Sequence, residues 1–234
     1  MEVHWLEQTE SDVPSGDDWL SVNEQLRLEG LRFPKRRADW RLGRWTAKRA
    51  VAAYLNMPAF DEDMAKIEIR AAPSGAPDLA IASSPARLAI SLSHRAGVAF
   101  CGVAPFGTAL GCDLEMMEPR SDSFIGDYFT PEEQALIARA SPGDRSRIAT
   151  LLWSGKESAF KALRVGLRFD TRCAVVIPLG RIRNPVLTWY PLLVRVVDGQ
   201  TFNGWWRQAG DLIRTVVAAP RALSPLKIET DGQA

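Results

Sequence analysis

The chain has 234 residues, of which 46% are hydrophobic and 24% are charged, which is ordinary for a globular protein with a sizeable core. Its 29 basic and 28 acidic residues nearly balance, and this disfavours nucleic acid as a partner bound through bulk charge. No apolar stretch reaches membrane-spanning length, no signal peptide is apparent, and the 3 cysteines form no C-x-x-C pair. We therefore expect a cytoplasmic protein without a membrane partner.

Hydrophobic periodicity predicts strands and helices in both halves of the chain. The elements expected in the first half are a strand over 2–8, helices over 21–31 and 36–55, strands over 67–70, 87–93 and 98–104, and a proline-rich loop over 72–86. Those expected in the second half are a strand over 109–115, a helix starting at Thr130-Pro131, a helix from about Asp144 to Val165, and strands over 172–219 with turns near Asp198-Gly199 and Asn203-Gly204. This mixture predicts an α+β fold with halves 1–107 and 108–234.

Two acids stand at strand spacing in Gly111-Cys112-Asp113-Leu114-Glu115. Side chains alternate along a strand, so Asp113 and Glu115 point to one face, where their charges repel unless a cation lies between them. Oxygen ligands of this kind suit a hard divalent cation. The alternative is a solvated edge strand whose two carboxylates bind nothing.

The segment Trp153–Lys161 places an acid and two lysines on a helix whose opposite side is apolar. Glu157 and Lys161 are four residues apart and therefore share a face. Together with the acids upstream, they suggest metal-assisted chemistry on a phosphorylated substrate. A routine helix-surface ion pair, worth a few tenths of a kcal/mol, is the alternative.

Two further groups suggest phosphate binding. Arg37, Arg41, Arg44 and Lys48 follow three- and four-residue steps and form one basic stripe, which suits phosphate but also describes a solvated basic face. The segment Ser91–Arg95 ends a strand, and its polar side chains could hold a phosphate or form a simple surface turn.

These pieces, in chain order, resemble the 4′-phosphopantetheinyl transferases. The pieces are Gly43-Arg44, Gly75-Ala76-Pro77, Ser91–Arg95, Gly-x-Asp-x-Glu at 111–115 and Trp-x-x-Lys-Glu-x-x-x-Lys at 153–161. The subgroup that looks most similar is the stand-alone surfactin-synthetase type. Many relatives have lysine where this chain has Ala76, so one contact of the family is missing here.

The resemblance implies an enzyme that transfers 4′-phosphopantetheine from coenzyme A to a serine of an acyl or peptidyl carrier protein and releases 3′,5′-ADP. Such carriers serve fatty acid, polyketide or nonribosomal peptide biosynthesis. It also implies a monomer built as a pseudo-twofold arrangement of two similar α+β halves, with the active site between them. The carrier is expected to be acidic.

By the same resemblance, Asp113, Glu115 and Glu157 hold Mg²⁺, and Asp113, Glu157 and Lys161 are catalytic. Glu157 is the proposed base toward the carrier serine, and Lys161 stabilises the departing 3′,5′-ADP. The residues expected to contact the coenzyme A substrate are Arg44, Lys48, Gly75, Pro77, Ser93 and His94.

The segment after the acidic strand offers an apolar patch, which either docks the carrier or packs in the core. Its members are Met116, Met117, Phe124, Ile125 and Tyr128. Two rival functions remain open: another Mg²⁺-dependent enzyme of nucleotide or phosphoryl transfer, and a non-catalytic relative that binds coenzyme A or a carrier.

Overall fold

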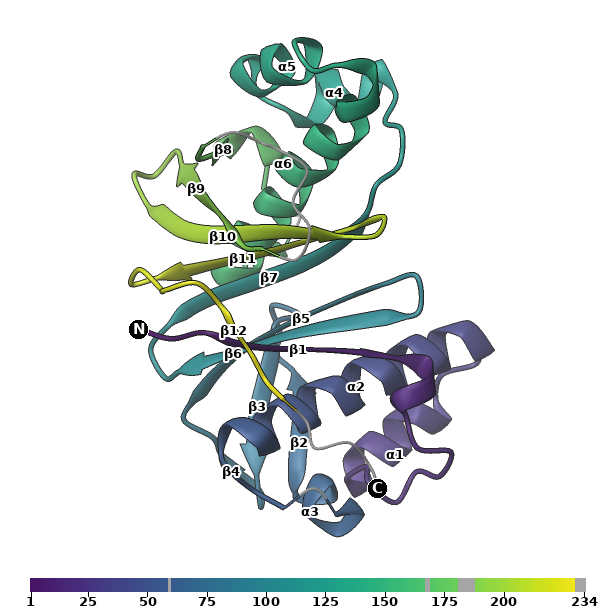
Figure 1. The fold of residues 1–234 in the computed structure, drawn as a ribbon. Coiled ribbons are helices and arrows are strands. Elements are labelled where there is room, and N and C mark those ends of the chain that lie inside the picture. Colours follow the sequence, from purple (N-terminus) through teal and green to yellow (C-terminus); the bar gives the residue numbers. More distant parts are fainter. Residues whose placement is uncertain (59, 167–168, 181–187, 230–234) are drawn as a thin grey trace. The chain divides into compact units, whose positions relative to one another are not determined.

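The computed structural model describes residues 1–58, 60–166, 169–180 and 188–229, and the chain divides into two compact units (Figure 1). The N-terminal unit comprises Glu2–Gly107 and the described residues from Leu226 onward. The C-terminal unit comprises Met1 and Thr108–Pro225. The expected half 108–234 is wrong in its tail, because β12 (Leu226–Lys227) pairs in parallel with β1 (His4–Thr9) of the N-terminal unit.

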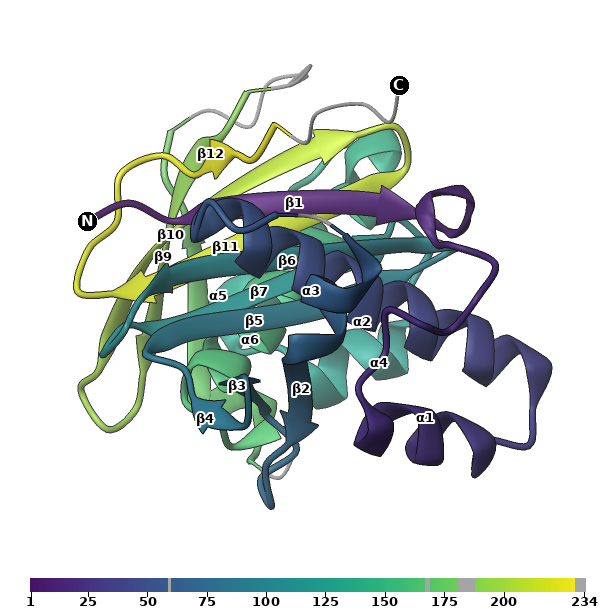
Figure 2. The same ribbon diagram turned by 90° about the horizontal axis from the view of Figure 1, so that it is seen from below.

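The N-terminal unit is a sheet covered by one long helix, α2 (Pro34–Tyr54) (Figure 2). Among its described residues, four strands form this sheet in the order β12-β1-β6-β5, and β2, β3 and β4 form a second sheet of three. Trp45 and Val51 of α2 pack in a core with Leu6 and Val103. The remaining elements are η1 (Glu10–Asp12), α1 (Val22–Glu29), α3 (Asp61–Lys66), β2 (Ile67–Ala71), β3 (Pro77–Ile81), β4 (Ser84–Pro85), β5 (Leu88–Arg95) and β6 (Val98–Pro105).

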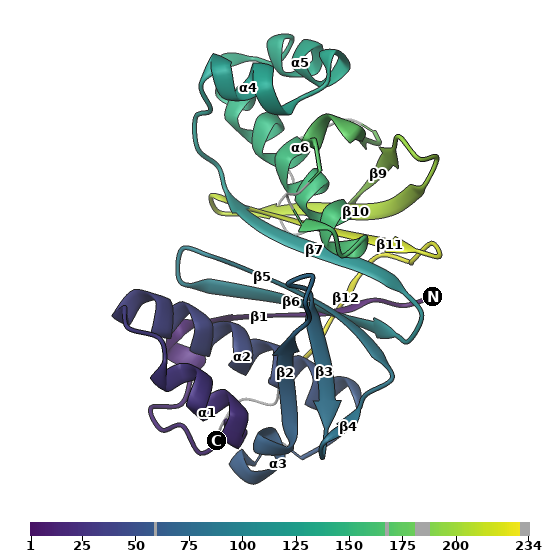
Figure 3. The same ribbon diagram turned by 180° about the vertical axis from the view of Figure 1, so that it is seen from behind.

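The C-terminal unit repeats this plan around α6 (Pro142–Ala162), which lies against the sheet with α4 and α5 at one end (Figure 3). Its described strands form a five-stranded sheet in the order β7-β11-β10-β9-β8. Leu151 and Phe160 of α6 pack in a core with Val176 and Phe202. The remaining elements are β7 (Ala109–Met116), α4 (Asp122–Tyr128), α5 (Pro131–Ala138), η3 (Thr171–Cys173), β8 (Ala174–Pro178), β9 (Tyr190–Val196), β10 (Thr201–Ala209) and β11 (Leu212–Ala219).

The two units share one topology. In each, the first strand pairs antiparallel with a later strand, which forms a hairpin with the strand before it: β1-β6-β5 and β7-β11-β10. In each, a 21-residue helix that begins with proline lies between them in the chain. The predicted α+β class is therefore confirmed, and the halves are similar in plan; the pseudo-twofold relation and a site between the halves stay predictions.

A buried lysine anchors each long helix. Lys156 of α6 forms an ion pair of 2.7 Å with Glu133 and donates to the carbonyl oxygens of Thr171 and Ala174. Glu133 also closes the capping box of α5 with Thr130. Its second carboxylate oxygen accepts from the backbone amide of β8 at Val176. The Lys156–Glu133 pair therefore ties together three elements of the C-terminal unit.

The N-terminal unit contains the same anchor. Lys48 of α2 forms an ion pair of 2.5 Å with Glu24 and donates to the carbonyl oxygens of Trp19 and Met64. Glu24 closes the capping box of α1, and its other oxygen accepts from the amide of Ile69 in β2. We call Lys48–Glu24 and Lys156–Glu133 the two clamps. The repeated pattern Trp-x-x-Lys, at 45–48 and 153–156, is their sequence signal.

Three details differ from the sequence prediction. The predicted loop 72–86 contains β3 and β4. The pair Asn203-Gly204 lies inside β10 rather than in a turn. A Cβ at Gly204 would lie 2.6 Å from the Val216 carbonyl oxygen, so this glycine permits close strand packing. Helix α6 ends at Ala162, shortly before Arg164 takes a positive φ of 58°. No helix in the described part of the chain is long and apolar enough to cross a membrane.

Candidate active site

Gly111 brings α6 into direct contact with β7. A Cβ at this position would lie 1.8 Å from the carbonyl oxygen of Ser158, so only glycine permits the approach. The close packing lets Lys161 of α6 reach Asp113 of β7, with Nζ 2.7 Å from Oδ1. The same ammonium donates to the Cys112 carbonyl oxygen at 3.1 Å. The two motifs found in the sequence therefore meet in one site of the C-terminal unit.

Asp113 is almost fully buried, with 3% of its surface exposed. Its Oδ1 accepts from Lys161, and its Oδ2 accepts from the Ser154 hydroxyl at 2.8 Å. Burial alone would lower the pKa of Lys161, but the charge and hydrogen bond of Asp113 outweigh it, so that this pKa is raised. Lys161 therefore stays a cation at neutral pH.

Glu157 lies beside this pair, and its pKa is raised. Burial raises its pKa to about 7, the negative charge of Asp113 adds to the rise, and Lys161 opposes it. A pKa near neutrality suits a group that must both accept and release a proton. It also marks a place where negative charges crowd and a cation would be favoured.

Glu115, the other acid of the strand, is half-buried and lies 3.6 Å from Arg120. No cluster of three or more His, Cys, Asp or Glu side chains in the described ranges has the arrangement of a formed metal site. The donors nevertheless fit Mg²⁺ in kind, because Asp113, Glu115 and Glu157 supply only carboxylate oxygens and interact electrostatically.

Most members of the predicted basic stripe of α2 hold the N-terminal unit together, and a phosphate site there stays a prediction. Arg37 donates to the carbonyl oxygen of Leu28, and Arg41 donates to those of Pro14 and Gly16. Lys48 is 0% exposed within its clamp, which leaves it no surface to offer coenzyme A. The prediction of a coenzyme contact at Lys48 is therefore corrected.

Arg44, the remaining member, keeps a small exposed surface. Its Nε lies 3.8 Å from Glu24, and its guanidinium stacks at 4.8 Å from the ring centre of Trp40. Burial lowers the pKa of Arg44, and Glu24 opposes that shift. Arg44 therefore contacts Glu24 of the clamp on one side and Trp40 on the other.

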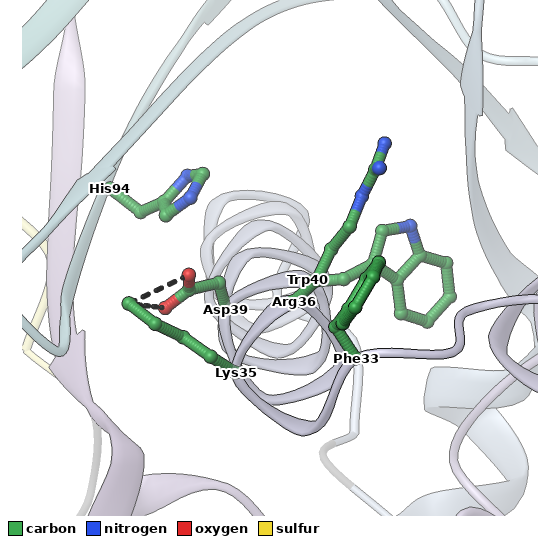
Figure 4. A pocket seen from close by; sticks show the side chains of 6 residues that line it. All are labelled: Phe33, Lys35, Arg36, Asp39, Trp40 and His94. Atoms are coloured by element: carbon green, nitrogen blue, oxygen red, sulfur yellow. Dashed lines mark hydrogen bonds and ion pairs between the residues drawn. The ribbon is translucent and has the colours of Figure 1, made fainter.

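This pocket, of about 390 Å³, opens at the start of α2 and is lined by Phe33, Lys35, Arg36, Asp39, Trp40 and His94. The exposed His94 comes from β5, and Figure 4 shows its ring across from the Lys35–Asp39 pair, whose ion-pair distance is 3.0 Å. Two cations, a histidine and an aromatic ring are suited to a phosphate and a flat base. The sequence singled out His94, and it placed Lys35 and Arg36 among the basic residues of this helical region but outside the regular stripe.

The other expected coenzyme contacts do not line this pocket. Gly75 sits in the turn between β2 and β3 with a φ of 87°, and no atom lies within 4 Å of where its Cβ would be. Pro77 begins β3 and pairs with Ala71. Ser93 is buried in β5, next to His94. Their roles toward coenzyme A stay predictions.

The apolar residues after β7 divide between core and surface. Ile125 is buried, and Phe124 is half-buried with its ring 5.2 Å from that of Trp153. Tyr128 keeps 39% of its surface exposed and packs edge-on against Trp153. Arg120 lies over the Phe124 ring at 5.0 Å. The exposed part of the patch is therefore an aromatic surface with a cation beside it.

Comparison with known proteins shows which family this site resembles. The model of the 4′-phosphopantetheinyl transferase superfamily matches residues 109–206, which include every acidic and basic residue named above for the C-terminal unit's site. Over these residues the chain is similar to this superfamily. The 4′-phosphopantetheinyl transferase HetI of Nostoc sp. (strain PCC 7120 / SAG 25.82 / UTEX 2576) is 28% identical over 172 residues, 71% of this chain and 70% of HetI. These matches indicate an enzyme of the transferase class.

Two solved structures are similar over a smaller part. One is a holo-(acyl-carrier-protein) synthase from Bacillus anthracis str. Ames in complex with CoA (3′,5′-ADP), with 22% identity and a TM-score of 0.37, covering 44% of this chain and 92% of that one. The other is the holo-[acyl-carrier-protein] synthase of Helicobacter pylori in complex with coenzyme A, with 19% identity and a TM-score of 0.31, covering 44% and 98%. At these TM-scores the two likenesses carry no weight for the fold.

Proposed function

We propose that this phosphopantetheinyl transferase moves 4′-phosphopantetheine from coenzyme A to a serine hydroxyl of an acyl or peptidyl carrier protein, with Mg²⁺. The observation that carries the proposal is the site on β7 and α6, where Lys161 pairs with Asp113 beside a Glu157 whose pKa is raised to about 7. This site lies within the segment matched by the superfamily model.

The reaction exchanges one phosphorus–oxygen bond for another. The serine oxygen bonds to the phosphorus next to pantetheine, the pyrophosphate bridge breaks, and 3′,5′-ADP leaves with the bridging oxygen. Glu157 accepts the serine proton, a step for which its pKa near 7 is well placed. Burial of the carboxylate supplies this basicity, which an exposed glutamate lacks.

Lys161 acts on the leaving group. Negative charge grows on the departing phosphate as the bond breaks, and a fixed ammonium stabilises that charge more in the transition state than in the bound substrate. Asp113 holds the Lys161 side chain in place through the 2.7 Å ion pair. The raised pKa of Lys161 keeps the cation available.

The carboxylates of Asp113, Glu115 and Glu157 would hold the Mg²⁺. When bound, the ion neutralises charge on the pyrophosphate of coenzyme A. Glu115 now faces Arg120 at 3.6 Å, and Asp113 faces Lys161, so both acids have a cation as partner. Arg120 and Lys161 thus offset the negative charges of Glu115 and Asp113.

The pocket at the start of α2 is the proposed site for a phosphate of coenzyme A. Lys35, Arg36 and His94 supply donors, and Trp40 offers a ring for stacking against the base. Arg44 supports this site by packing on Trp40. The aromatic surface of Phe124 and Tyr128, with Arg120 beside it, is the proposed contact for an acidic carrier.

Intact-mass spectrometry of an apo carrier tests the function. The carrier is incubated with enzyme, coenzyme A and Mg²⁺, and a carrier whose acceptor serine is alanine serves as the control. We expect a gain of one phosphopantetheine on the wild-type carrier alone, across at least one member of a panel of acyl and peptidyl carriers. An unchanged mass on every carrier, together with release of phosphate from nucleotides, would favour the rival phosphoryl-transfer enzyme.

A non-catalytic relative is the second rival, and it predicts binding of coenzyme A or carrier without a change in mass. The complete set of Asp113, Glu115, Glu157 and Lys161 argues against it. The surfactin-synthetase subgroup, the cytoplasmic location and the monomeric state stay predictions.

A further inference from the structure

A chain of buried hydroxyl groups lies behind Asp113. Ser154 of α6 donates to Asp113 Oδ2 at 2.8 Å, and its oxygen lies 2.9 Å from the Thr215 hydroxyl of β11. Ser158 of α6 lies 2.7 Å from that same hydroxyl. Thr215 stands directly opposite Asp113 in the pairing of β7 with β11, and all three hydroxyl residues are 0% exposed.

The hydrogen bonds of this chain have one consistent direction. Ser154 has a single hydroxyl proton, which it gives to the Asp113 carboxylate, so toward Thr215 it acts as an acceptor. Thr215 directs its proton toward Ser154, whose hydroxyl and carbonyl oxygens each lie 2.9 Å away, and accepts in turn from Ser158. The Ser154 hydroxyl thus points to the carboxylate, while Thr215 holds Ser154 through both its carbonyl and its hydroxyl oxygen.

The N-terminal unit shows that a long helix can pack on its sheet without this chain. By the shared Trp-x-x-Lys pattern, Thr46 and Ala50 of α2 stand where Ser154 and Ser158 stand in α6. Thr46 donates to the carbonyl oxygen of Leu42 in its own helix, and Ala50 has no hydroxyl. The N-terminal unit, which has Arg49 in place of Glu157, therefore lacks these hydroxyl groups on its long helix, so packing alone does not require them.

We propose that Ser154, oriented by Thr215 and Ser158, is a positioning residue for the metal ligand Asp113. Its hydrogen bond fixes the carboxylate through Oδ2 and leaves Oδ1 as the oxygen for cations, the role that Lys161 now fills. Groups that orient a ligating carboxylate strengthen metal binding without touching the metal. The inference rests on the proposed function only in that the cation is Mg²⁺ or its substitute Mn²⁺.

The test is Mn²⁺ binding by the whole protein without coenzyme A or carrier, measured by calorimetry and by electron paramagnetic resonance. Ser154→Ala and Thr215→Val each remove one hydroxyl group, whereas Thr215→Ser keeps the hydroxyl group at position 215. The matched control is Thr46→Val, which removes a buried hydroxyl at the equivalent place in the N-terminal unit. We expect Ser154→Ala and Thr215→Val to weaken Mn²⁺ binding by about 10- to 100-fold, whereas Thr215→Ser and Thr46→Val bind normally.

A second readout separates positioning from stability. In the transfer assay, Ser154→Ala should need more Mg²⁺ for half-maximal rate yet recover most of kcat at saturating Mg²⁺. Wild-type Mn²⁺ affinity in Ser154→Ala would overturn the inference while leaving the transferase function intact. If no carrier accepts phosphopantetheine, the proposed function fails, and Mn²⁺ binding still decides the role of Ser154. Equal weakening in Thr46→Val would also overturn it, since the loss would then reflect general destabilisation.

Discussion

The two units build one scaffold and equip it differently. Both hold a 21-residue helix on a sheet with a clamp of buried lysine and glutamate. One position after the clamp lysine, however, the C-terminal unit has Glu157 and the N-terminal unit has Arg49. Five positions after it, the C-terminal unit has Lys161 and the N-terminal unit has Ala53. What the units share therefore stabilises the fold, and we propose that what differs performs the chemistry.

The comparison also distinguishes two kinds of lysine within the same helix. Lys156 and Lys161 both belong to the Trp153–Lys161 motif, yet Lys156 is fully buried and Lys161 keeps 28% of its side chain exposed. Burial of a charge is costly unless it is paired and hydrogen-bonded, which the clamp achieves. A partly exposed lysine can instead meet a substrate.

The largest effect is expected from breaking a clamp. Lys48→Met or Lys156→Met leaves a buried glutamate without its partner and should lower the free energy of unfolding by about 3–5 kcal/mol. Adding Glu24→Gln to Lys48→Met removes the stranded charge and should recover part of the loss. Denaturant unfolding measures these effects. A raised KM for coenzyme A in Lys48→Met at unchanged stability would instead restore Lys48 to the coenzyme site.

The next effect concerns catalysis in the C-terminal unit. Lys161→Ala should cut kcat by roughly 10²-fold or more, the scale of losing one donor to a charge that develops in the transition state. The KM for coenzyme A should change far less. Lys66→Ala, which breaks the exposed ion pair with Asp63, is the control and should leave kcat unchanged. Near-normal turnover in Lys161→Ala would remove this residue from the mechanism.

A smaller effect is expected in the pocket of the N-terminal unit. Arg36→Ala and His94→Ala should each raise the KM for coenzyme A by roughly 10-fold, as the loss of one hydrogen bond to a charged group does, with a lesser change in kcat. Steady-state kinetics with coenzyme A and dephospho-coenzyme A distinguish the 3′-phosphate from the pyrophosphate as the group recognised. Arg70→Ala, which removes an exposed arginine from the same unit, controls for net charge. Unchanged KM values in both pocket variants would place coenzyme A elsewhere.

The smallest effect is a pH dependence of stability. The pKa of Glu157 rises on folding from 4.5 to about 7, so the folded state favours the protonated acid. Its contribution is fully present below pH 4.5 and is lost as pH rises through 7. Without Mg²⁺, the wild type should lose several °C in Tm over this range relative to Glu157→Gln, because each unit of pKa is worth about 1.4 kcal/mol and about 1 kcal/mol shifts Tm by roughly 2–4 °C at this size. Parallel Tm curves for the two proteins would show that burial does not perturb this acid.

The catalytic motifs were predictable from the sequence because they are short and local. Asp113, Glu157 and Lys161 lie on a strand and a helix whose periods fix the faces of their side chains, and the structure joins them. The contact of β7 with α6 was not predictable from the pattern, because it depends on the missing Cβ of Gly111 against the backbone of α6. Nor were the partners of Asp113 on β11, since Thr215 is brought opposite only by strand pairing.

The basic stripe of α2 shows a related limit. A helical repeat of cations reports one face of the helix, but not what covers it. Backbone carbonyl oxygens of α1 and of the segment before it cover this face, so Arg37 and Arg41 serve as internal donors. The W-x-x-K repeat at 45–48 and 153–156 was the available signal for both the duplication and the clamps.

The central claim, that the chemistry belongs to the residues by which the C-terminal unit differs, is tested most directly by one pair of variants. Glu157→Gln and Arg49→Gln place the same side chain at equivalent positions of the two long helices. Transfer of phosphopantetheine to an apo carrier is measured for both at saturating Mg²⁺ and coenzyme A. We expect at least a roughly 10²-fold loss of rate in Glu157→Gln, the lower range for removing a catalytic base, and a rate within a few-fold of wild type in Arg49→Gln. Equal losses in the two variants, or full activity in Glu157→Gln, would contradict the account.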